Sequence, residues 1–69
     1  MNYKYEVHQR EWNSGNIVAI IFASNLLEDC RDFADKWNDM TDKLYEAKCI
    51  DDKYCHFADV YNNENDKYV

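Results

Sequence analysis

The feature of this sequence that most restricts its fold is a helical repeat of apolar residues between Asn25 and Leu44. Asn25 followed by Glu28 has the spacing of a capping box, with Asn in the position usually taken by Ser or Thr. No glycine or proline interrupts the segment. The pattern predicts an amphipathic helix from about residue 25 to about residue 44 that buries one apolar side. The residues expected on the buried side are Leu26, Cys30, Phe33, Ala34, Trp37, Met40 and Leu44.

The opposite side of the predicted helix carries a row of carboxylates, because acidic residues recur there three and four positions apart. Two i,i+4 pairs, Asp32–Lys36 and Asp39–Lys43, are expected to support the helix slightly. A plain solvated face is the simplest interpretation, but such faces usually mix charges of both signs. Here the basic residues are expected at the edges of the row. The row consists of Glu28, Asp32, Asp35, Asp39, Asp42 and, if the helix reaches that far, Glu46.

Two predicted strands precede the helix. Tyr3, Tyr5 and Val7 alternate with polar residues, as in a half-buried strand. Residues 13–16 contain the only glycine of the chain and indicate a tight hairpin turn. Residues 17–23 are apolar on both faces, which is typical of a strand in the middle of a sheet. One helix covers only one face, so the other is expected to be closed by the chain's own aromatic residues, a second copy or a partner.

Two interpretations are open for residues 45–61. In the first, residues 45–50 and 54–61 are strands joined by the Asp-Asp-Lys turn at 51–53. In the second, Asp52 caps another helix, because apolar and aromatic residues from Tyr54 to Tyr61 also recur at helical intervals. We favour the strands, because the polar turn lies between two short aromatic and apolar runs.

The expected fold is therefore α+β: a small antiparallel β-sheet with one amphipathic helix packed on one face, in the order β-hairpin, helix, β-hairpin. Residues 67–69 are expected to add a short edge strand. Residues 1–69 make a single domain with a small core, and aromatic residues, at 16% of the chain, are available to fill it.

The charge and the apolar runs exclude several classes of function. Fourteen acidic residues against eight basic ones give a formal net charge of −6, which does not suit direct binding to nucleic acid or to anionic lipid. The longest apolar run, residues 17–23, is too short to span a bilayer, and the N-terminus lacks a signal-peptide pattern. Three cysteines, an odd number, favour reduced thiols in the cytoplasm.

Cysteine and histidine residues supply the one candidate metal site. Cys49, Cys55 and His56, with Cys30 or His8, have the right ligand chemistry for zinc but lack the paired Cys-x2–4-Cys spacing. A hairpin would bring Cys49 near Cys55 and allow a disulfide, although two reduced thiols are favoured. The chain offers no Ser–His–Asp set, activated thiol or phosphate-binding glycine loop. We therefore predict no enzymatic activity, no metal site and no cofactor.

In size, negative charge, hairpin–helix layout and aromatic content, the chain resembles the small acidic inhibitor proteins of phages and mobile elements, including anti-CRISPR and other anti-defence proteins. No motif carries this resemblance, so no residue roles are transferred from it. It implies an interaction module that inhibits a target by binding its basic, nucleic-acid-binding surface in the host cell cytoplasm. The rise along the carboxylate row, roughly 5 to 6 Å per step, is comparable with phosphate spacing. The expected contact residues are Glu28, Asp32, Asp35, Asp39 and Asp42.

The alternative is a homo-oligomeric assembly module, for example a homodimer. In this case the second face of residues 17–23 would be the interface, with Val18, Ile20 and Phe22 or their alternates buried between copies. The acidic helix would then serve solubility only.

Overall fold

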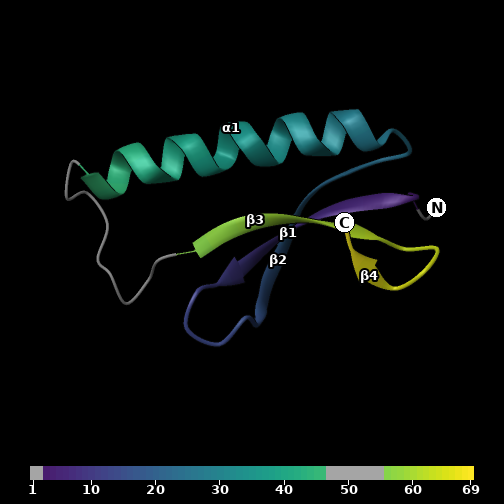
Figure 1. The fold of residues 1–69 in the computed structure, drawn as a ribbon, viewed down its shortest axis with the longest axis horizontal. Coiled ribbons are helices and arrows are strands. Elements are labelled where there is room, and N and C mark those ends of the chain that lie inside the picture. The colour runs from purple at the N-terminus through teal and green to yellow at the C-terminus, as the bar shows by residue number, and fades with distance from the viewer. Residues whose placement is uncertain (1–2, 47–55) are drawn as a thin grey trace.

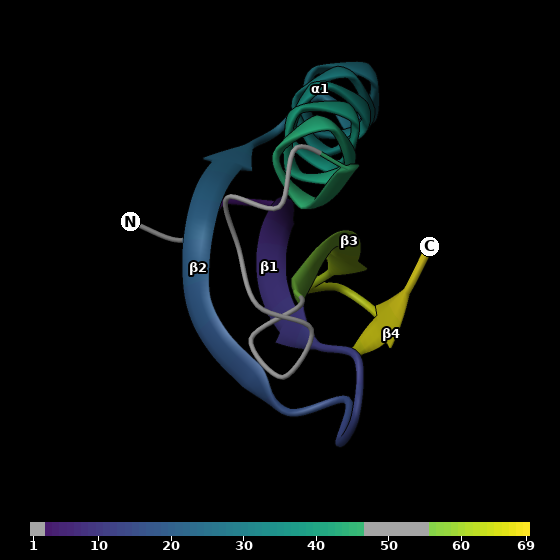
Figure 2. The same cartoon turned by 90° about the vertical axis from the view of Figure 1, so that its left-hand side faces the viewer.

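Four strands and one helix make up the fold in a computed structural model that describes residues 3–46 and 56–69 (Figure 1). The strands form one antiparallel sheet in the order β2-β1-β3-β4, and the helix lies across one face of it (Figures 1 and 2). The predicted α+β class is therefore confirmed. In chain order the elements are β1 (Tyr5–Glu11), β2 (Ile17–Ser24), α1 (Leu27–Glu46), β3 (His56–Asn62) and β4 (Lys67–Tyr68).

The central strands are β1 and β3, and the prediction that residues 17–23 lie in the middle of the sheet is wrong. β1 pairs with β2 on one side and with β3 on the other, so that Val7 faces both Phe22 and Val60. The connection through α1 returns the chain to the free side of β1, where β3 adds. β2 is thereby left at the edge with only one neighbouring strand, and its apolar composition does not reflect a central position.

The turn between β1 and β2 is the predicted one. The amide of Gly15 donates to the carbonyl of Glu11 at 2.8 Å, and the amide of Glu11 donates to the carbonyl of Asn16 at 3.0 Å. Gly15 has a φ of 73°, a conformation that L side chains rarely adopt.

β2 is irregular as well as peripheral. Its pairing with β1 shifts register twice, so that Val18 and Ile21 have no partner residue on β1. Such bulges bend a strand and increase its twist, and β2 is visibly curved in Figure 2.

The helix begins two residues later than predicted, at Leu27. The predicted cap is wrong, because the side chain of Asn25 accepts instead from the backbone amide of Lys4 at 3.0 Å. The hydroxyl of Ser24 accepts from the amide of Leu26 at 3.1 Å, which forms a local turn just before the helix. The helix ends at Glu46, so it does reach the last acidic residue of the predicted row.

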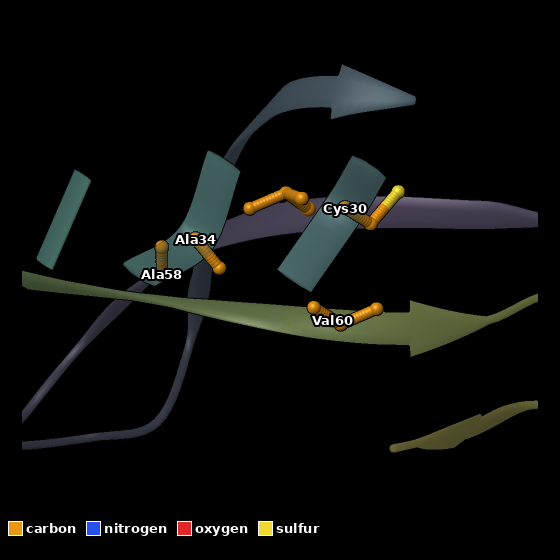
Figure 3. Packing of buried hydrophobic residues seen from close by; sticks show 5 residues of the cluster. Cys30, Ala34, Ala58 and Val60 are labelled. Carbon is orange, nitrogen blue, oxygen red and sulfur yellow. The ribbon is translucent and has the colours of Figure 1, made fainter. Parts of the chain in front are cut away.

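The core lies between α1 and the two central strands. Its five buried side chains are small, which allows the helix to pack closely on the sheet (Figure 3). Phe33 and Trp37 are partly buried beside it, and Phe33 stacks on Phe22 with ring centroids 4.6 Å apart. The five core residues are Val7, Cys30, Ala34, Ala58 and Val60.

Two residues of the predicted buried side are exposed. Leu26 precedes the helix and is 63% exposed, and Met40 is 54% exposed. Met40 is the member of the predicted set closest to the acidic side of the helix, at about 100° per residue, so it lies beyond the edge of the sheet contact. The predicted burial of Leu44 falls outside the described side chains.

The second hairpin is formed by different residues from those expected. Tyr45 and Glu46 belong to α1, and the rest of the predicted strand at 45–50 lies outside the described residues. The predicted strand at 54–61 corresponds to β3, which is described from His56 onward, and the helical alternative is wrong for residues 56–62. β4 confirms the predicted edge strand at 67–69 and completes a β3–β4 hairpin.

Candidate functional site

The predicted carboxylate row is a real surface of α1. All five predicted contact residues are exposed, and they lie on the side of the helix opposite the core. The helix carries seven acidic and three basic residues, so most of the net charge of −6 belongs to this one element. We call the five the acidic ridge: Glu28, Asp32, Asp35, Asp39 and Asp42.

Ion pairing within α1 leaves most of the ridge available. Lys43 pairs with Asp39 at 3.1 Å, as predicted, but both side chains are about seven-tenths exposed and such a pair contributes little. The predicted Asp32–Lys36 pair is not among the ion pairs of the described residues. Lys36 instead shares a cleft with Asp29, Asp32 and two stacked phenylalanines, Phe22 and Phe33.

A second cleft runs along the other side of the ridge, between α1 and β3. Arg31 and Asp35 of the helix line it, together with Asp59 of β3 and Val69. The ridge is thus flanked by two clefts, each containing charged and apolar groups. A flat partner would contact the ridge itself, and protruding side chains of that partner could enter the clefts.

Asn38 has a structural role that the sequence analysis missed. Its side-chain amide donates to the carbonyl of Ala58 at 3.1 Å, and its side-chain oxygen accepts from the amide of Ala58 at 2.7 Å. The side chain therefore replaces a neighbouring strand at the part of β3 that β4 does not reach. A polar residue on the buried side of a helical pattern was the only signal, and it does not reveal the partner.

The sheet face away from α1 carries a polar and aromatic cluster that was also missed. His8 is 4% exposed and is joined by hydrogen bonds to Glu6 at 2.9 Å and to the hydroxyl of Tyr68 at 3.0 Å. Its ring stacks on Tyr61 with centroids 4.8 Å apart. The only sequence signal was the alternation that places Glu6, His8 and Arg10 on one face of β1.

Arg10 closes this cluster. Its guanidinium pairs with Asp59 at 2.9 Å, donates to the carbonyl of Gly15 at 3.0 Å and lies 4.1 Å from the ring centroid of Tyr68. The order Glu6, His8, tyrosine has the form of an acid–base relay. However, the rings and the guanidinium cover it, and neither of the two clefts that flank the ridge includes it. We interpret it as the packing that closes this part of the sheet.

Exposed apolar residues gather instead on the first half of β2. Ile17 is 54% exposed, Val18 48% and Ile20 58%, and the neighbouring Trp12 is exposed as well. Trp12 is packed against Phe57 with ring centroids 4.4 Å apart. β2 contains no charged residue.

The candidate metal site is only partly described. Cys49 and Cys55, and with them the possible disulfide, lie outside the described residues. Cys30 is buried in the core, and this burial raises the pKa of its thiol above the ordinary 9.0. Among residues 3–46 and 56–69, no three His, Cys, Asp or Glu side chains are grouped as metal ligands would be.

Within the same residues, no helix is both long enough and apolar enough to cross a membrane. Comparison with protein families, with curated proteins and with solved structures finds no match to this chain.

Proposed function

We propose that this chain is a small acidic protein-interaction module that inhibits a target by covering its basic, nucleic-acid-binding surface, as anti-CRISPR and other phage anti-defence proteins do. The partner is a protein with a basic surface that belongs to a nucleic-acid-binding complex in the cytoplasm of the host cell. The chain itself binds no nucleic acid directly and catalyses no reaction.

The observation that carries this proposal is the acidic ridge. Its five carboxylates extend over fourteen residue steps, or about 21 Å at 1.5 Å per residue. They stand on a rigid helix whose other side is fixed by the core. A rigid array binds at a lower entropic cost than flexible side chains on a loop.

Electrostatics would act on both the rate and the specificity of this binding. A ridge of one sign steers a basic partner into contact, and this steering weakens as salt rises. Exposed ion pairs contribute little singly, whereas close charge pairs that become buried in an interface contribute more. Arg and Lys side chains that normally hold phosphates would be the natural counterparts of Asp32, Asp35 and Asp39.

The proposal is tested by affinity capture from nuclease-treated host extract, with elution in steps of rising salt. The expected result is a basic nucleic-acid-binding protein that elutes at moderate salt and that added nucleic acid displaces. The binding of that protein is then measured for a ridge variant, Asp35→Lys with Asp39→Lys. We expect a loss of roughly a hundredfold in affinity, about tenfold per reversed carboxylate.

The matched control is Glu11→Lys with Glu64→Lys. It changes the net charge by the same amount, and both residues are exposed at places away from the helix. This control should bind nearly as the wild type does. Equal binding by the ridge variant and the wild type would refute the ridge as the contact, and binding unaffected by nucleic acid would refute mimicry.

A further inference from the structure

We propose that β2 is a self-association edge: two copies of this chain pair their β2 strands antiparallel about a two-fold axis perpendicular to the sheet and form one continuous eight-stranded sheet. The acidic ridge plays no part in this contact. The inference therefore stands independently of the proposed function.

The first argument is the chemistry of the edge. Strands at sheet edges expose unpaired backbone groups, and proteins commonly protect them with charged residues, proline or a covering element. Ile17–Ser24 contains no charge and no proline. Ile17, Val18 and Ile20 are about half exposed, on a strand with only one neighbour. Among residues 3–46 and 56–69, the two bulges are the protective feature of this edge.

On the opposite side of the sheet, the backbone groups of Ala58 and Val60 in β3 are already bonded. The amide and the carbonyl of Ala58 both bond to Asn38, and the amide of Val60 donates to the side chain of Asp59 at 3.0 Å. The carbonyl of Val60 accepts from the amide of Val69 at 2.8 Å. A strand added along β3 would therefore meet groups that are already bonded, and β4 is only two residues long. Among the described strands, β2 is the long edge that is open to extension.

A second copy of β2 matches this edge in both shape and composition. β2 is bent and twisted by its two bulges, so a straight, regular strand would not follow it closely. Rotation about a two-fold axis perpendicular to the sheet changes neither the direction of an out-of-plane bend nor the handedness of the twist. The second β2 therefore has the same out-of-plane shape as the first. It is also uncharged, as pairing with an uncharged apolar edge requires.

The net charge of −6 does not prevent this contact. α1 packs most closely against β3 and also contacts β1 and β2. The two helices of the dimer would therefore lie on the same face, about four strand spacings apart. Four spacings are about 19 Å, more than twice the Debye length of about 8 Å at physiological ionic strength. Most of the acidic charge would thus be screened, whereas contacts through the helices would bring the ridges together.

The test is the molar mass of the full chain by size-exclusion chromatography with light scattering over a range of concentrations. We expect a shift from 8.3 kDa toward twice that mass as concentration rises. Ile20→Lys should raise the dissociation constant of the dimer by roughly tenfold or more, because two-fold symmetry brings two like charges into one uncharged interface. Hydrogen exchange at residues 17–23 should slow with concentration in the wild type only.

Leu26→Lys is the matched control, because Leu26 is as exposed as Ile20 and lies outside the strand. It adds the same charge and should leave the dimer intact. Circular dichroism checks that both variants are folded. A wild type that stays monomeric at millimolar concentration overturns the proposal. So does an Ile20→Lys variant that dimerises like the wild type, or an equal loss in both variants. Capture of a basic partner by the ridge is unaffected by any of these results.

Discussion

The two edges of the sheet differ in how their backbone groups are satisfied. At the β3 edge, Asn38, Asp59 and Val69 each supply a hydrogen bond at a position that β4 is too short to reach. At the β2 edge the chain supplies bulges and exposed apolar side chains, and the strand has one neighbour.

This difference follows from the position of the single helix. α1 lies on one face of the sheet (Figure 1) and packs most closely against β3. The side chain of Asn38 therefore reaches the outer edge of β3 and bonds to Ala58 there. Residues 3–46 and 56–69 contain no second helix with which to cover β2. A small α+β protein can thus close one edge internally, and the other is left available for association.

The largest expected difference in stability is between a lysine introduced into β3 and a lysine introduced into β2. Val60 of β3 is 6% exposed, whereas Val18 of β2 is 48% exposed. Val60→Lys buries an unpaired charge in the core and should remove at least about 4 kcal/mol of unfolding free energy, enough to unfold a small domain. Val18→Lys should cost under about 1 kcal/mol. Urea denaturation measures both.

These measurements are made at a protein concentration low enough that dissociation of a dimer does not contribute. Val60→Ala serves as a milder control, with an expected loss of about 1 to 3 kcal/mol. If Val18→Lys destabilises the protein as strongly as Val60→Lys, β2 is covered in solution and the contrast between the edges fails.

The second expected effect measures the contribution of the Asn38 side chain, which bonds to the outer edge of β3. Asn38→Ala leaves both the amide and the carbonyl of the buried Ala58 without their partner. We expect a loss of about 2 to 4 kcal/mol, at about 1 to 2 kcal/mol for each of the two unsatisfied groups, the lower part of the usual range. Asn38→Asp keeps the acceptor for the Ala58 amide but sets a carboxylate oxygen against the Ala58 carbonyl, so it should not restore the wild-type stability.

Asp42→Ala is the control for this substitution, because it truncates an exposed residue of the same helix. It should change the unfolding free energy by less than about 0.5 kcal/mol. A loss at Asn38 no greater than that at Asp42 would mean that water replaces the side chain at this edge. The β3 edge would then be no better protected than β2.

Periodicity was sufficient to predict most of the fold. The spacing of Cys30, Ala34 and Trp37 identified the packed side of the helix, and the alternation from Tyr5 to Val7 identified the first strand. The glycine-containing turn fixed the first hairpin. These signals are local, and local patterns determine which elements form and which side of each is apolar.

The position of each strand in the sheet was not predictable in the same way. Apolar residues on both faces of residues 17–23 suggested a central strand, but β2 lies at the edge of the sheet. The same composition also suits an edge strand that pairs with another chain. The bond between Asn38 and Ala58 joins residues twenty positions apart and leaves no periodic trace. The acidic ridge was predictable because it needs only the helical period, whereas its binding partner is a property of another molecule.

The smallest expected effect is a pH dependence confined to the covered edge. Partial burial raises the pKa of Tyr61 above its ordinary 10.0, and the hydrogen bond that it donates to Asp66 at 3.1 Å adds to this. Below pH 10 the phenol is protonated in both the folded and the unfolded chain, so its contribution to stability is complete. As pH rises above 10, the unfolded chain loses the proton first, and the contribution falls until the folded pKa is passed.

Tyr61→Phe should therefore flatten the decline of the urea midpoint above pH 10. Burial of the Cys30 thiol causes a similar decline above pH 9.0, but this is common to wild type and variant and cancels in their difference. β2 has no titratable side chain. Hydrogen exchange in this pH range should accelerate at the β3–β4 hairpin relative to β2, after correction for intrinsic rates, and Tyr61→Phe should remove that difference. Equal acceleration of hydrogen exchange at the β3–β4 hairpin and at β2 would show that the two edges open together. The edges would then differ in structure but not in local stability.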